Sequence, residues 1–245
     1  MRGLGLAVGG LLALLLGLVA LTWRDGADGL RGQDPAGPQH RFSETEVLPM
    51  GKTPLRIVAL GTSLTRNALW PDDLARALTA CSGRPVLVTR IAEVGENSAW
   101  GLTQAQAVAA LTPDLVLIEF AINDADLRDG LSLDAALDAH LRLLDVLAAE
   151  APAARPVLMT MNRAFGLRGL LRPWLGAHYA QYRRLAAERD IGLIDLAPLW
   201  SAAPATGPDG VRLLPDGLHP TDAAVAHIAL PSLVTELGRR LPGCA

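Results

Sequence analysis

The sequence has few of the residues that mark metal sites and nucleic-acid surfaces. Only two cysteines occur among the 245 residues, and they are too few and too far apart for a zinc site. The chain contains no H-E-x-x-H motif, no cluster of cysteine and histidine and no P-loop motif, so metalloprotease and nucleotide-hydrolase functions have no support. The formal charge of -3 comes without a basic cluster, which gives no electrostatic reason to expect nucleic acid. The sequence therefore favours no metal and no nucleic-acid partner.

The two cysteines, Cys81 and Cys244, leave two readings open. In an oxidising compartment they can form an intrachain disulfide, and closing so long a loop stabilises the fold by about 4 to 5 kcal/mol in the chain-entropy model. The other reading is a pair of free thiols at helix ends. A sequence does not show whether the two Cα atoms come within about 7 Å, which a disulfide requires.

The N-terminus holds the longest uncharged run of the chain. The 21 residues from Gly3 to Trp23 carry no charge and lie between Arg2 and Arg24. As a helix they would reach roughly 31 Å, which matches a hydrocarbon core of about 30 Å. Residues 1–23 therefore predict a membrane anchor or a signal peptide, and the poor cleavage site at the end of the run favours the anchor. Either reading places the rest of the chain outside the cytoplasm.

After this run the composition predicts one linker and one domain. Residues 24–54 are rich in glycine and proline and show little apolar periodicity, which is typical of a flexible linker. Residues 55–245 have the length of one ordinary domain and show no internal repeat.

Short apolar runs alternate with helical patterns along this domain, which indicates an α/β fold with a parallel sheet. The expected strands are residues 56–60, 86–91, 115–120, 157–161 and 192–196. The expected helices are residues 71–79, 101–111, 132–150, 175–189 and 222–241, the last interrupted at Pro231. Nearly continuous apolar strands fit a five-stranded sheet covered on both faces, hence an open α/β/α sandwich.

Ligands of such sheets bind beyond the carboxyl ends of the strands. Ser63 follows the first expected strand, Gly95 the second and Asn123 the third, while Asp216 and His219 follow the fifth. Each alone is more simply read as a turn, a helix cap or a surface residue. Together they provide what ester cleavage needs: a nucleophile, a base, a group that orients the base, and oxyanion donors. We therefore expect Ser63, His219 and Asp216 to form a triad, and the Ser63 N–H, the Gly95 N–H and the Asn123 side chain to form an oxyanion hole.

These blocks resemble those of the SGNH hydrolase superfamily, the GDSL-like lipases and esterases. Ser63 in Gly-Thr-Ser-Leu, Gly95, Asn123 and His219 match the four residues of the family name, and Asp216-x-x-His219 is the most specific block. The resemblance covers roughly residues 56–237 and implies a flavodoxin-like, three-layer α/β/α sandwich. It also implies a serine esterase that acts on carboxylic esters, including O-acetyl groups on glycans, and needs no cofactor.

The sequence departs from the family pattern at two positions, which bear on the subfamily and the substrate. Thr62 stands where the family name has aspartate, and Ala121 stands where glycine is common. Neither position carries a proton in the expected mechanism. The alternatives are an O-acyltransferase that passes the acyl group to an extracytoplasmic glycan, and a non-catalytic binding module that kept the fold.

Three further residues are candidate substrate contacts. Trp70 and Trp100 come shortly after the serine and glycine blocks, and Arg163 follows the fourth expected strand. The two tryptophans are suited to line an acyl or sugar site, and Arg163 to meet an anionic substrate. Core packing for the tryptophans and a solvated loop position for the arginine are the simpler readings.

Overall fold

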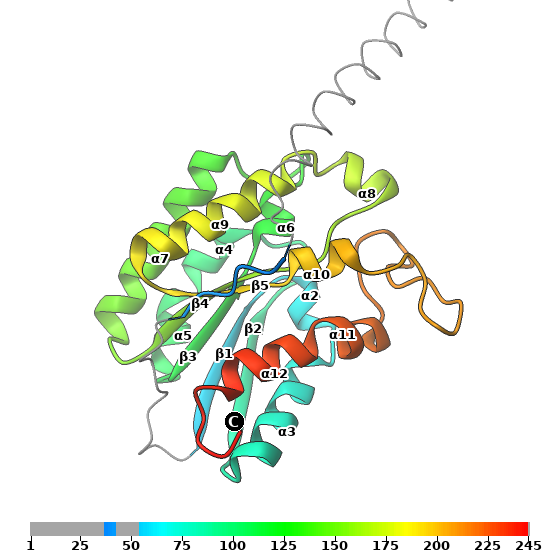
Figure 1. Ribbon diagram of the computed structural model, residues 1–245. Helices are drawn as coiled ribbons and strands as arrows, with labels where there is room; N and C mark the ends of the chain where they lie inside the picture. The colour runs from blue at the N-terminus through cyan, green and yellow to red at the C-terminus, as the bar shows by residue number, and fades with distance from the viewer. Residues whose placement is uncertain (1–36, 43–53, 245) are drawn as a thin grey trace, which may run out of the picture. The chain divides into compact units, whose positions relative to one another are not determined.

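The computed structural model describes residues 37–42 and 54–244, and its centre is a five-stranded sheet (Figure 1). All neighbouring strands are parallel, in the order β2-β1-β3-β4-β5. Their bounds are Leu55–Gly61 (β1), Val86–Ala92 (β2), Leu115–Glu119 (β3), Arg155–Thr160 (β4) and Gly192–Asp195 (β5). Every residue of β3 and β5 is buried, as expected of strands covered on both faces. The predicted α/β/α sandwich is confirmed.

Helices cover both faces of this sheet (Figure 1). One layer holds α3 (Trp70–Ser82), α11 (Asp222–Ile228) and α12 (Leu230–Gly238), and the other holds α4 (Ser98–Thr103), α5 (Ala105–Ala110), α7 (Leu133–Glu150) and α9 (Leu175–Arg189). Four short helices follow strands β1, β3, β4 and β5 in turn: α2 (Ser63–Arg66), α6 (Ala121–Asp124), α8 (Gly166–Leu170) and α10 (Ala197–Ala202). Buried aliphatic side chains of the strands and of both helix layers form the core.

The helix boundaries follow local chemistry. Ser132 caps α7 by accepting a hydrogen bond from Ala135 N at 3.2 Å, as the sequence predicts. The helix expected over residues 222–241 is broken into α11 and α12, with Pro231 in the first turn of α12, where its missing N–H costs nothing. The helix expected over residues 101–111 is instead two short helices that meet at Gln104.

A short segment before the domain, residues 37–42, lies against the edge strand β5. Arg41 and Leu193 exchange two backbone hydrogen bonds, at 2.9 and 2.7 Å. His40 Nδ1 accepts from Asp195 N at 3.1 Å, and Gln39 N donates to Asp195 Oδ2 at the same distance. These six residues therefore cover an open sheet edge and differ from the flexible linker expected over residues 24–54.

The other predictions for the N-terminal part concern residues outside the described ranges. These are the anchor or signal peptide over residues 1–23 and the remainder of the linker. Within residues 37–42 and 54–244, no helix combines the length and the apolar character that crossing a membrane requires.

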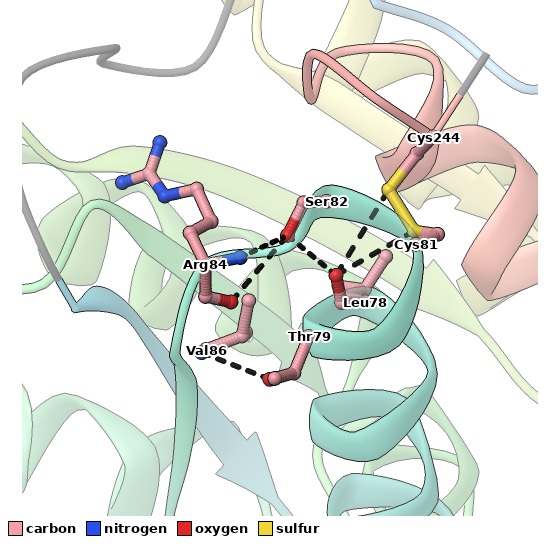
Figure 2. Close-up of a disulfide and its surroundings, with 7 residues drawn as sticks. All are labelled: Leu78, Thr79, Cys81, Ser82, Arg84, Val86 and Cys244. Atoms are coloured by element: carbon pink, nitrogen blue, oxygen red, sulfur yellow. Dashed lines mark hydrogen bonds between the residues drawn. A yellow bond between two sulfur atoms is a disulfide. The ribbon is translucent and has the colours of Figure 1, made fainter.

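A disulfide joins Cys81 to Cys244 (Figure 2). Cys81 lies in the last turn of α3, and the Cα atoms of the two cysteines are 4.7 Å apart. In the same turn Thr79 Oγ1 accepts from Val86 N at 3.0 Å, which ties the end of α3 to the start of β2. The disulfide therefore fastens the C-terminal segment to a helix that is itself held by the sheet.

We expect removal of this disulfide to lower the free energy of unfolding. It closes a loop with a sequence separation of 163 residues, so the double variant Cys81→Ser, Cys244→Ser should lose about 4 to 5 kcal/mol in the chain-entropy model. Urea unfolding without reductant measures the loss. Reductant should shift the wild-type midpoint and leave the double variant unchanged; an equal response of both proteins would contradict the prediction.

Candidate active site

The strand order brings three of the predicted site residues to one edge. β1 lies between β2 and β3, and Gly61 at its end is in register with Ala92 and with Glu119. The loops that leave these three strands therefore start side by side. They carry Ser63, Gly95 and Asn123, respectively.

Ser63 is the first residue of α2, and a buried carboxyl group holds the turn before it. Thr62 caps the helix by accepting from Leu64 N at 3.2 Å. Glu119 Oε1 accepts from Thr62 N at 2.6 Å and from Thr65 Oγ1 at 2.7 Å. The Glu119 side chain fills the space that a Cβ at position 61 would need, which explains the glycine there.

His219 connects Ser63 to Asp216. Its Nε2 lies 2.8 Å from Ser63 Oγ, across 156 residues of sequence, and its Nδ1 lies 2.7 Å from Asp216 Oδ2. Because a carboxylate only accepts, Nδ1 carries the proton, and Nε2 of the neutral ring is free to accept from the serine hydroxyl. The three side chains thus form one hydrogen-bonded series.

The charge of Asp216 is fixed by its surroundings. Burial alone would raise its pKa, but hydrogen bonds from the His219 ring and from the backbone N–H groups of His219 and Leu218 outweigh burial and hold the pKa at about 2. The backbone bonds are 2.7 Å from His219 N and 3.0 Å from Leu218 N, both to Oδ1. Asp216 is therefore ionised at neutral pH and keeps the imidazole in the tautomer described above.

A second serine–histidine pair shows why the tautomer matters. Ser232 Oγ lies 3.0 Å from His40 Nε2, but His40 Nδ1 accepts from Asp195 N. A neutral ring that accepts at Nδ1 donates at Nε2, so His40 donates to Ser232 and has no free lone pair for its proton. The imidazole of His219 can therefore take a proton from its serine, and that of His40 cannot.

Gly95 and Asn123 lie in contacting loops. Gly95 has φ +82°, a conformation that favours glycine. The carbonyl of Glu96, the residue after Gly95, accepts a hydrogen bond from Asn123 Nδ2 at 2.8 Å. Asp124 strengthens the link, because its Oδ1 accepts from Ser98 N at 2.8 Å. The structure thus joins the two loops that carry Gly95 and Asn123 to each other.

The three residues predicted to contact substrate differ in their burial and their contacts. Trp70 is only 2% exposed and its indole N–H donates to Leu64 O at 2.9 Å, so it packs in the core and offers no surface to a substrate; that expectation is corrected. Trp100 is partly buried, with its ring 6.2 Å from that of Phe120 in an edge-to-face arrangement. Arg163 Nη1 lies 3.5 Å from Ser201 Oγ of α10.

Sequence reasoning missed the buried polar residues that support the site. Glu119 holds the serine turn, Asn162 Nδ2 donates at 2.7 Å to the carbonyl of Leu218 beside His219, and Arg172 contacts the Asn123 loop. Of these three residues, only Glu119 could have been noticed in the sequence, because it is an acidic residue in an otherwise apolar strand. In the part of the chain that the structure describes, no group of three histidine, cysteine or acidic residues is arranged to hold a metal ion.

A parallel sheet with serine, histidine and aspartate hydrogen-bonded in series at its carboxyl edge is typical of serine hydrolases with an α/β/α fold. A model of the GDSL-like Lipase/Acylhydrolase family matches residues 57–226, and the chain belongs to this family, which is part of the SGNH hydrolases. No curated protein matches the sequence.

Several solved structures share the fold. A lipase/acylhydrolase from Enterococcus faecalis aligns with a TM-score of 0.63 at 21% identity, over 77% of this chain and 97% of its own. TesA aligns with a TM-score of 0.59 at 23% identity, over 76% and 99%. An acetylxylan esterase from Geobacillus stearothermophilus gives 0.61 at 16% identity, over 76% and 95%. At these identities the likeness concerns the fold.

Glu119 makes the stability of the fold depend on pH. Burial raises its pKa from the ordinary 4.5 to about 7, against hydrogen bonds from Thr65 and Thr62 that lower it. A carboxyl whose pKa is higher in the folded state holds its proton while the unfolded chain releases it. The contribution of Glu119 to stability is therefore fully present below pH 4.5 and is lost as pH rises to about 7.

Glu119→Gln, which mimics the protonated carboxyl, should remove this dependence. Over that pH range the wild type is expected to lose ~3 kcal/mol relative to the variant. Urea unfolding at several pH values measures the difference, with Glu150→Gln at the exposed end of α7 as the matched control. Parallel pH profiles for wild type and Glu119→Gln would show that Glu119 does not cause the pH dependence of the free energy of unfolding.

Proposed function

We propose that this protein is a serine esterase that cleaves carboxylic esters through an acyl-enzyme, with Ser63 as nucleophile, His219 as base and Asp216 as the group that orients the base. The observation that carries the proposal is the continuous series of contacts: Ser63 Oγ to His219 Nε2 at 2.8 Å and His219 Nδ1 to Asp216 Oδ2 at 2.7 Å. Membership of an acylhydrolase family supports the reaction class.

In the first half of the reaction, Ser63 Oγ bonds to the ester carbonyl carbon while its proton passes to His219 Nε2. The tetrahedral intermediate then breaks its bond to the alcohol oxygen, which leaves with the proton from Nε2. In the second half, water attacks the acyl-enzyme, gives a proton to Nε2, and the acid departs as Ser63 takes that proton back. Asp216 stabilises the imidazolium that forms twice.

Three donors are assigned to the oxyanion: the Ser63 N–H, the Gly95 N–H and the Asn123 amide. The amide nitrogen of Asn123 has two hydrogens, and the bond to Glu96 O uses one of them. The second hydrogen is available to the developing charge. Donors fixed before the reaction stabilise that charge without rearrangement in the transition state.

The proposed substrates are small-molecule or glycan esters, including O-acetyl groups. The fold shared with an acetylxylan esterase is in keeping with an acetylated glycan, and Trp100 and Arg163 are proposed contacts for it. We also propose that residues 1–23 tether the enzyme to a membrane on its extracytoplasmic side. The disulfide between Cys81 and Cys244 supports an oxidising compartment.

Ser63→Ala should abolish the hydrolysis of p-nitrophenyl esters, because it removes the hydroxyl that is proposed to accept the acyl group. The measurement is the release of p-nitrophenol from esters of increasing chain length, together with free acid as product. In a parallel assay with a sugar acceptor added, acylated sugar in place of free acid would identify an acyltransferase.

The matched control is Ser232→Ala, which removes a serine that also contacts a histidine ring. It should keep wild-type activity. Full activity in Ser63→Ala, or none in the wild type, would contradict the proposed function and favour a binding module.

Asn123→Ala should lower kcat about 100-fold or more while the domain stays folded. Loss of one oxyanion donor typically costs about 3 kcal/mol of transition-state stabilisation. The measurement is kcat and KM for the same ester, with the exposed Asn67→Ala as control. A kcat within threefold of wild type would exclude the amide as an oxyanion donor.

A further inference from the structure

Arg172, in the loop between α8 and α9, is a buried cation under the loop that carries Asn123. Its side chain is only 3% exposed, and its Nε donates to the carbonyl of Ile122 at 2.7 Å. The neighbouring Leu171 accepts from Leu127 N at 2.9 Å, so the two loops are joined along their length. Arg172 thus holds the backbone immediately before Asn123.

The charge of Arg172 is balanced by Asp126. Arg172 Nη2 lies 2.7 Å from Asp126 Oδ2, and the Asp126 side chain is 2% exposed. Arg128 adds a second cation at 2.8 Å from the same oxygen. A buried ion pair needs close geometry and further hydrogen bonds to offset its desolvation, and Arg172 has both, because Nη1 also donates to Arg168 O at 3.3 Å.

The Asn123 amide lies between a donor and an acceptor. Its Nδ2 donates to Glu96 O at 2.8 Å, and its Oδ1 lies 3.5 Å from Arg172 Nη2. Turning the amide over would place an oxygen against the Glu96 carbonyl and an NH2 group against the guanidinium. Both contacts would then be repulsive, so the two neighbours select a single orientation.

We propose that Arg172 is a positioning residue for the oxyanion hole: it fixes the backbone at Ile122 and the orientation of the Asn123 amide, so that one amide hydrogen stays directed at the reacting carbonyl. The proposal rests on the esterase function proposed above. Arg172 itself touches no substrate and acts through Asn123. Its positive charge near Oδ1 also polarises the amide, which strengthens Nδ2 as a donor to an anion.

Arg172→Gln should therefore lower kcat about 10- to 100-fold and leave KM within about threefold, since the loss concerns the transition state and not substrate binding. The effect must also depend on Asn123. In an Asn123→Ala background the same substitution should lower kcat by less than threefold, because the amide that Arg172 orients is gone. Losses that multiply in the double variant would assign Arg172 a merely structural role.

Arg172→Gln leaves the buried Asp126 carboxylate without its closest positive charge, which could prevent folding. The double variant Asp126→Asn, Arg172→Gln is therefore measured beside it. If the single variant does not fold, the double variant tests the proposal. It removes both buried charges and is expected to show the same selective loss of kcat. Arg184→Gln, an exposed arginine on α9, is the matched control. A wild-type kcat in the charge-neutral double variant would overturn the proposal, whereas an inactive wild type would instead overturn the esterase function.

Discussion

The parallel pairing of β1 with both β2 and β3 is the constraint on which the rest of the site depends. It places Gly61, Ala92 and Glu119 in one register, so the three following loops leave the sheet at the same level. A shift of this register would separate Ser63 from Gly95 and Asn123. His219 arrives from a distant segment, and its contact with Ser63 closes the arrangement.

Buried polar side chains support the loops that carry Ser63, Asn123 and His219. Glu119 holds the turn of Ser63, Asp126 and Arg172 hold the loop of Asn123, and Asn162 holds the carbonyl beside His219. Polar groups in such positions are costly unless they are paired, and each of these side chains makes at least one hydrogen bond or ion pair to a loop. The same bonds that satisfy these groups therefore restrict the reacting side chains to one geometry.

Much of the fold could be predicted from the sequence, because five apolar runs alternate with helical patterns and their strand ends are marked by polar residues. The residues proposed for the triad and the oxyanion hole could be selected for the same reason, since they lie in short blocks at those ends. The role of Trp70 could not, because an apolar core and an apolar subsite use the same side chain. The role of Arg172 could not be predicted either, since an arginine between two helices normally lies in solvent. Only the tertiary structure shows that its guanidinium is buried against Asp126 and the Ile122 carbonyl.

Identification of the residue that becomes covalently modified tests the central claim most directly. A fluorophosphonate probe reacts with an activated serine, and peptide mass spectrometry of the labelled protein shows which residue carries the adduct. The account predicts one adduct, on Ser63, and its loss in His219→Ala. An adduct on Ser232 or another side chain, or labelling of Ser63 that persists without His219, would contradict the account.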